Sequence, residues 1–216
     1  MEKVTPRDII VEKYTHHVLT YNEKPKSVYA FAAENNMEEA DFYQYFGSFE
    51  AINSAIFVDL FKNTMALLRQ NEAFQQGDAQ HKLLSFYFTF FEMLTANRSI
   101  VLYILKENEN HLKTLKVLNE LKTEYTDFVE SLNIQTPDVI MDNFANIVDR
   151  GMSKMSYGQL LFIMKFWMED TSPSFEKTDV LIEKTMHVGF EVLNTKPIDT
   201  IVDLGKFLWK EKVNKK

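Results

Sequence analysis

Histidine and carboxylate side chains are the groups of this sequence that could bind a metal ion or transfer a proton. The histidines are His16, His17, His81, His111 and His187. None forms a His-x-x-x-His pair, and no Glu-x-x-His repeat occurs, so the spacings that place metal ligands on one helix face are missing. Acidic pairs such as Glu38 and Glu39 are not isolated in apolar surroundings, as a catalytic acid would be. With no glycine-rich phosphate loop and no serine elbow, the sequence predicts neither an enzyme nor a metal or cofactor site.

Recognition of DNA is the other chemistry that the N-terminal quarter could perform. Lys24, Lys26 and Tyr45 can contact phosphates, and Gln44 can form a bidentate pair with adenine. The set of residues that we predict to contact DNA is Lys24, Lys26, Ser27, Ala40, Tyr43, Gln44 and Tyr45.

The charge of the same region opposes DNA binding. Residues 1–50 contain five Lys and Arg against nine Asp and Glu, which gives a formal charge of −4. Three of the acids, Glu38, Glu39 and Asp41, are close together and would repel phosphates. A carboxylate could still accept a hydrogen bond from cytosine. The alternative interpretation is a solvated helix start whose acids complement the helix dipole.

The whole composition indicates a globular protein. Hydrophobic residues make up 45% of the 216 residues and aromatic residues 13%, which excludes a disordered chain. The chain has no cysteine, so disulfides and thiolate chemistry are excluded, and this fits the cytoplasm that we predict. We find no signal peptide, and no apolar run approaches the roughly 18 to 20 residues of a membrane span. The net charge of −7 argues against broad, nonspecific nucleic-acid binding.

The elements that position these residues are predicted to be helices throughout. Six Gly and five Pro punctuate the chain, and apolar residues recur at three- and four-residue spacing. The first helix is predicted to begin at Pro6 with Thr5 as its cap, and Ser27 is predicted to cap the second. A third, short helix covers residues 38–46.

The three short helices form a predicted head over residues 1–50. Asn35 and Asn36 are predicted to make the tight turn of a helix-turn-helix, since Asn tolerates left-handed backbone angles. Ser48 then caps a long helix over residues 49–73. The predicted fold is therefore all-α, with this head followed by a helical bundle over residues 51–216.

The predicted bundle contains helices that are apolar on nearly every side. Its first two helices cover residues 81–105, with a break at Asn97. A further helix is predicted over residues 110–132, and Pro137 opens the next. Gly151 and Gly158 predict a kink or break in that helix. The last predicted helices cover residues 174–193 and 198–216.

The order of these N-terminal elements resembles the TetR family of bacterial transcription regulators. The resemblance rests on "RDIIVEKY", "SVYAFAAE", "MEEADFYQYF" and "GSFEAI". Tyr43 and Phe46 match an aromatic pair of the family, and we expect both to be scaffold rather than base readers. Ser48 and Glu50 match the start of the fourth helix. The sequence departs from the family at Phe49, where Lys is usual beside a DNA phosphate, and in the acids of the third helix.

The resemblance implies a homodimer whose two heads bind DNA half-sites and whose bundle binds an effector. By this resemblance, the dimer helices would cover about residues 157–169 and 174–193. The bundle offers many apolar and methionine side chains that adapt to a hydrophobic small molecule or lipid. The residues that we predict to line its pocket are Phe86, Phe90, Met93, Leu102, Tyr103, Phe144, Met164, Trp167 and Met168. Packing in the core is the alternative for each.

A second resemblance lies near the C-terminus. The segment from Trp167 to Met186 is similar to the C-terminal segment of the lipid-binding proteins of ubiquinone biosynthesis, which share the TetR fold. It contains Asp170, Ser172, Pro173 and Phe175, which also fit a helix stop followed by a new helix start.

The similarity implies an alternative function, a lipid-binding or carrier protein with a degenerate head. Residues 198–213 form a basic amphipathic helix with Trp209, which allows peripheral membrane contact. Burial against the bundle or a partner chain is the alternative for this helix.

Overall fold

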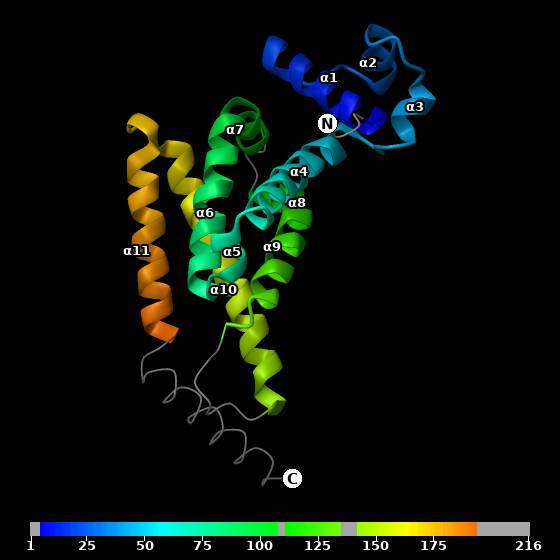
Figure 1. Ribbon diagram of the computed structural model, residues 1–216. Coiled ribbons are helices and arrows are strands. Elements are labelled where there is room, and N and C mark those ends of the chain that lie inside the picture. The colour runs from blue at the N-terminus through cyan, green and yellow to red at the C-terminus, as the bar shows by residue number, and fades with distance from the viewer. Residues whose placement is uncertain (1–4, 108–110, 135–141, 194–216) are drawn as a thin grey trace. The chain divides into compact units, whose positions relative to one another are not determined.

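The regular structure of this chain is helical. The structure, a computed structural model, describes residues 5–107, 111–134 and 142–193. Within these ranges it has eleven α-helices, one 3-10 helix and no strand, which confirms the predicted all-α class (Figure 1). The α-helices are α1 (Pro6–Tyr21), α2 (Val28–Glu34), α3 (Glu39–Tyr43), α4 (Phe49–Arg69), α5 (Glu72–Gln76), α6 (Ala79–Ala96), α7 (Arg98–Glu107), α8 (His111–Val117), α9 (Asn119–Ser131), α10 (Asp142–Glu169) and α11 (Glu176–Leu193). The 3-10 helix η1 is Pro173–Phe175.

The helices group into two compact units, and each unit is described by itself. The first comprises Met1–Leu67 and Thr89–Glu124, and the second comprises Leu68–Phe88 and Tyr125–Lys216. The predicted boundary at residue 50, between a head and a bundle, stays a prediction.

Helix α1 begins at Pro6 with Thr5 as its N-cap, which confirms the prediction. The Thr5 hydroxyl accepts a hydrogen bond from the Asp8 N–H at 3.3 Å, and Asp8 Oδ2 accepts one from the Thr5 N–H at 2.9 Å. This capping box satisfies two free backbone donors, and the hydrogen bonds from Thr5 lower the pKa of Asp8. The helix ends at Asn22, whose φ of 53° is the left-handed conformation that Asn tolerates.

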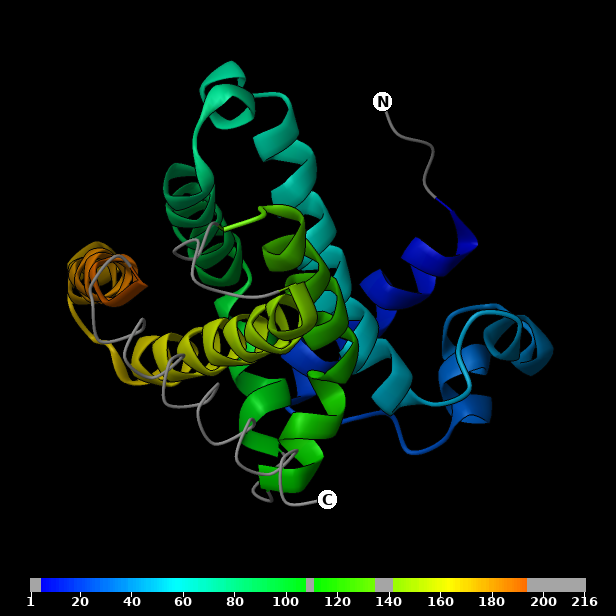
Figure 2. The same cartoon turned by 90° about the horizontal axis from the view of Figure 1, so that it is seen from below.

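Helices α2 and α3 form the helix-turn-helix, and α4 follows them (Figure 2). Ser27 caps α2, since its Oγ accepts from the Ala30 N–H at 3.1 Å, and Asn36 makes the turn with a φ of 54°. Both features confirm the predictions. Helix α3 is shorter than the predicted 38–46, because the residues after Tyr43 form a turn that carries the chain toward α4.

A cluster of aromatic rings forms the core of the head. The Phe42 ring centroid lies 5.4 Å from that of Phe49 and 6.0 Å from that of Phe31, and both contacts are edge-to-face. The Tyr14 ring stacks on Phe49 at 5.4 Å, and its hydroxyl donates to Asn53 Oδ1 at 2.9 Å. These rings fix α1, α2 and α3 against the start of α4, and edge-to-face pairs add to the free energy of burial.

The predicted scaffold role of Tyr43 is wrong, whereas that of Phe46 is confirmed. Phe46 is 5% exposed, but Tyr43 is 53% exposed. Phe42 takes the expected place of Tyr43 and is fully buried. The physical reason is helical spacing: Phe42 and Phe46 are four residues apart and share a face, and Tyr43 points about 100° away.

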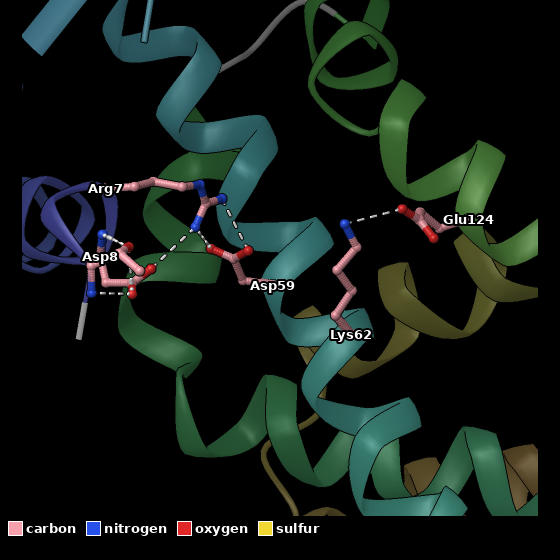
Figure 3. Close-up of polar contacts among 6 residues, drawn as sticks. Arg7, Asp8, Asp59, Lys62 and Glu124 are labelled. Carbon is pink, nitrogen blue, oxygen red and sulfur yellow. Dashed lines mark hydrogen bonds and ion pairs between the residues drawn. The ribbon is translucent and has the colours of Figure 1, made fainter. Parts of the chain in front are cut away.

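Helix α4 carries two ion pairs to neighbouring helices of the first unit (Figure 3). Arg7 Nη1 and Nη2 on α1 donate to Asp59 Oδ2 and Oδ1 at 2.9 Å and 3.0 Å. Farther along α4, Lys62 Nζ lies 3.4 Å from Glu124 Oε1 on α9. Helix α4 is thus joined to α1 and to α9 by charged groups one helical turn apart.

Helix α4 ends at Arg69, before the predicted residue 73. Asn71 is the cause, because its Oδ1 accepts from the N–H groups of Ala73 and Phe74 and so begins α5.

In the described ranges, α4 alone is long and apolar enough to cross a bilayer by length and composition. Of its apolar window, 61% is buried inside the protein, as in a core helix. The pair α6 and α7 meets the same criterion only when taken together, and the pair is bent by 87°.

Helix α10 is continuous for 28 residues, so the break predicted at Gly151 and Gly158 is wrong. A glycine costs about 1 kcal/mol in a helix interior relative to alanine. That cost is offset here by a buried stripe at helical spacing, namely Tyr157, Leu160, Met164 and Trp167. The predicted helix over residues 110–132 is instead two helices, α8 and α9.

Helices α10 and α11 are neighbours in the second unit, where Gln159 Nε2 lies 3.5 Å from Met186 Sδ. The predicted helix start at Pro137 and the predicted last helix over residues 198–216 lie outside the described ranges.

Candidate nucleic-acid interface and ligand-binding residues

The exposed surface of α2 and α3 carries tyrosines, whereas the phenylalanines of the same segment are buried. Tyr29, Tyr43 and Tyr45 are 70%, 53% and 42% exposed. The buried phenylalanines are Phe31, Phe42, Phe46 and Phe49. Every tyrosine in this segment therefore places its ring where the hydroxyl can reach an external partner.

The other residues of the predicted DNA-contacting set lie at the surface of the head. Lys24 Nζ is bound to Glu50 Oε1 at 3.3 Å, and Lys26 is exposed after the buried Pro25. Ala40 and Gln44 are exposed on α3 and at its C-cap. Ser27 differs from these, because its hydroxyl is engaged in capping α2. Three of the seven predicted residues thus lie in the loop before α2 and its N-cap, and the other four lie in α3 and the turn after it.

The acidic start of α3 is held together by its own backbone. Asp41 Oδ2 accepts from the Glu38 N–H at 3.2 Å, and the Asp41 N–H donates to the Glu38 backbone oxygen at 3.0 Å. The Asp41 carboxylate therefore binds a free backbone donor at the helix start, which favours the interpretation as a dipole-matched helix start. These two backbone donors are not available to a phosphate.

The residues that we predict to line a ligand pocket are divided between the two units. Phe90, Met93, Leu102 and Tyr103 belong to the first unit. Phe86, Met164, Trp167 and Met168 belong to the second, and the side chain of Phe144 lies outside the described residues. Phe86 and Trp167 are fully buried, and Phe86 packs against Phe128 with ring centroids 5.1 Å apart. A single pocket made of all these residues stays a prediction.

A buried pair of tyrosines in the second unit escaped the sequence analysis. The hydroxyls of Tyr87 and Tyr125 are 2.9 Å apart, and they lie 3.4 Å and 3.3 Å from the backbone oxygen of Ser156. Burial raises the pKa of both tyrosines, and it raises that of the neighbouring Tyr157 to about 12. The hydroxyls therefore stay neutral hydrogen-bonding groups inside an aromatic core. The sequence signal for this pair is Tyr87, which carries a hydroxyl within the apolar run of α6.

Asp170 organises the turn between α10 and α11. Its Oδ1 accepts from the Ser172 N–H and hydroxyl at 2.8 Å and 2.7 Å, and its Oδ2 accepts from the Thr178 N–H and hydroxyl at 3.0 Å and 2.7 Å. Although burial acts to raise the pKa of Asp170, these hydrogen bonds outweigh it and lower the pKa to about 2. The segment that resembles the ubiquinone-biosynthesis proteins is thus a helix stop and start, as the packing interpretation predicts.

Across the described ranges, no group of three or more histidine, aspartate and glutamate side chains is placed to hold a metal ion. The predicted membrane-contacting helix, residues 198–213, lies outside those ranges.

Comparison with known proteins shows the family. The head and the helices after it define an all-α fold with an N-terminal helix-turn-helix. The family model for the tetracyclin repressor-like C-terminal domain matches residues 82–208, which is more than half of the chain. The chain therefore belongs to the TetR family of transcription regulators.

A solved structure shares the fold of this chain. The fatty acid degradation regulator FadR from Bacillus halodurans is similar to this chain with a TM-score of 0.59 and 17% sequence identity. The match covers 88% of this chain and 96% of that chain. At this identity the likeness shows a shared fold. No curated protein sequence matches the chain.

Proposed function

We propose that this regulator binds duplex DNA through α2 and α3, and that a hydrophobic small molecule or lipid in its C-terminal helices changes that binding. The observation that carries the DNA-binding part is the separation of exposed tyrosines from buried phenylalanines in the head. A scaffold needs no hydroxyl at exposed positions, so we assign the hydroxyls of Tyr29, Tyr43 and Tyr45 to contacts with phosphate and sugar.

Tyrosine suits a head that carries a net negative charge. A phenolic hydroxyl donates to a phosphate oxygen without adding a cation, so few counterions are released on binding. Lys24 and Lys26 would supply two cationic contacts in each protomer. A dimer with four such contacts predicts a slope of log K against log salt of about −4, which is shallow for a repressor.

The proposed homodimer would use α10 and α11. Met155, Phe162 and Phe166 are exposed along one face of α10, and Val180 and Val188 are exposed on α11. A chain rarely leaves this many large apolar side chains on neighbouring helices uncovered. A second copy of the chain fits this surface, because two heads on a twofold axis would read half-sites one DNA turn or a multiple of one turn apart.

The test begins by selecting duplexes from a random-sequence pool with the full-length protein. Affinity for the selected sequence is then measured at several salt concentrations for Tyr43→Phe and Tyr45→Phe. Each variant should bind about tenfold or more weakly, because a hydrogen bond to a charged group is lost in each protomer. Tyr21→Phe is the matched control, since Tyr21 is 63% exposed on α1 outside the predicted set. Selection of no sequence at low salt would exclude the proposed function.

The acidity of the head favours a second candidate function. A lipid-binding or carrier protein on the same fold would tolerate a charge of −4 in residues 1–50 and an acidic start of α3. Such a protein should select no DNA, and it should float with liposomes only when residues 198–216 are present. We expect the cytoplasm to be the site of action in either case.

A further inference from the structure

A surface pocket of the first unit lies between the end of α1 and one face of α7. Its volume is about 700 Å³, within the range of small-molecule sites. Asn22, Glu23 and Lys24 line it from the end of α1 and the following loop. Ser99, Leu102, Tyr103 and Lys106 line it from α7. Two of these residues, Leu102 and Tyr103, belong to the set predicted from the sequence to line a ligand site.

The α7 wall of this pocket is a continuous stripe. Ser99, Leu102, Tyr103 and Lys106 follow the spacing of three, four and seven residues that places side chains on one helix face. The stripe is about 10 Å long at the rise of an α-helix. On the opposite wall, the left-handed conformation of Asn22 ends α1 and sets the direction of the loop that contains Lys24.

The charges and hydroxyls of the lining select the class of ligand. Lys24 and Lys106 contribute two positive charges and Glu23 one negative charge, so the lining has one positive charge in excess. Lys106 forms no ion pair within the described residues, whereas Lys24 is bound to Glu50. Between them, Leu102 and the Tyr103 ring offer apolar area, and Ser99 offers a hydroxyl in the first turn of α7.

We propose that this pocket binds an amphipathic organic monoanion. The acidic group of the ligand lies at Lys106 and Lys24, and its apolar part covers Leu102 and Tyr103. A ligand of about 10 Å in length spans the stripe. The class is an aromatic or aliphatic carboxylate or sulfonate, because a polyanion would meet Glu23 and a neutral apolar molecule would leave Lys106 without a counter-charge.

A ligand in this pocket acts on the loop that connects α1 to α2, the first helix of the helix-turn-helix. An anion that shares Lys24 competes with Glu50, which lies in the first turn of α4, while Ser27 caps α2 three residues after Lys24. The regulatory consequence rests on the proposed function, since it requires that the head bind DNA. The binding itself does not, and it can be measured without DNA.

The test compares two fluorescent probes that share an aromatic body. 8-Anilinonaphthalene-1-sulfonate is an amphipathic monoanion, and N-phenyl-1-naphthylamine is its uncharged counterpart. Lys106→Gln should weaken binding of the sulfonate about tenfold and leave the amine unchanged, because only the sulfonate uses the ammonium group. Lys116→Gln on α8, which is exposed outside the pocket, should change neither. Equal loss of both probes, or loss of neither, would overturn the charge assignment.

A second measurement locates the probe in the folded, full-length protein. The chain has no cysteine, so Ser99→Cys introduces a single thiol into the pocket. The sulfonate should slow alkylation of this thiol by iodoacetamide several-fold, and it should not slow alkylation in Asn63→Cys, which is exposed on α4. Equal alkylation rates with and without the sulfonate in Ser99→Cys would show that it binds elsewhere and would overturn the site. Neither result depends on whether the protein binds DNA.

Discussion

The guanidinium of Arg7 lies over the ring of Phe46, 5.6 Å from its centroid, while its two terminal nitrogens bind Asp59. One side chain of α1 therefore contacts α4 and the aromatic residue that ends the turn after α3. Arginine can serve both partners because its planar group stacks on a ring and presents a two-pronged set of donors to a carboxylate.

Arg7→Lys should destabilise the protein even though it keeps the charge. Lysine has a single ammonium group, which can neither donate two parallel hydrogen bonds to Asp59 nor stack on the Phe46 ring. We therefore expect a loss of about 1 kcal/mol in the free energy of unfolding, measured with urea. Arg7→Met should cost about 1–2 kcal/mol, because it also leaves the half-buried Asp59 without its partner. If both variants unfold at the wild-type urea concentration, the ion pair contributes nothing to the head.

Lys26→Ala should weaken binding to all DNA sequences alike. Loss of one phosphate contact in each protomer should reduce the magnitude of the salt slope of the dimer by about 2. The measurement is a titration of the selected duplex and of an unrelated duplex at several salt concentrations. Lys13→Ala serves as the control, since Lys13 is exposed on α1 outside the predicted contact set. A change confined to the selected duplex would mean that Lys26 reads bases rather than phosphate.

Phe162→Glu should convert the proposed dimer to monomers. A carboxylate on the exposed apolar face of α10 would be buried without a partner in the dimer, which costs several kcal/mol. Sedimentation velocity measures the mass in solution. Leu67→Glu is matched in chemistry, because Leu67 is 52% exposed on α4, and it should leave the mass unchanged. A Phe162→Glu variant that remains dimeric would exclude this face as the interface.

Asp170→Asn should destabilise the protein at neutral pH by about 2 kcal/mol, and the difference from wild type should shrink in acid. The folded-state pKa of Asp170, about 2, is below the ordinary value of 3.8, so the ionised carboxylate stabilises the fold above pH 3.8. That stabilisation is lost as the pH falls through the folded-state pKa. Urea unfolding at pH 7 and at pH 3 measures it. Asp127→Asn, exposed on α9, should stay within about 0.5 kcal/mol of wild type at neutral pH.

Local signals in the sequence predict the head well. Thr5, Pro6, Ser27 and Asn36 act through the backbone groups of their own neighbours, so their roles follow from residue type and position. The choice between Phe42 and Tyr43 as the buried ring does not follow in this way. It depends on the rotation of a five-residue helix, which the packing against Phe31 and Phe49 fixes.

Long-range relationships account for what the sequence analysis missed. The hydrogen bond between the Tyr87 and Tyr125 hydroxyls joins residues 38 positions apart, so no local sequence pattern predicts it. The α1–α7 pocket likewise joins residues 22–24 to a stripe that begins at Ser99. The continuity of α10 reflects tertiary burial, which overrides the low helix propensity of Gly158.

Helix α1 is held near its start by the pair of Arg7 with Asp59 and at its middle by the contacts of Tyr14 with Phe49 and Asn53, whereas its end at Asn22 forms part of the pocket wall. Asn22 lies about 12 Å beyond Tyr14 at the rise of an α-helix, so a ligand that shifts the end of α1 by about 1 Å would bend this last segment by only about 5°. A bend of that size would displace the loop that leads into α2 and α3.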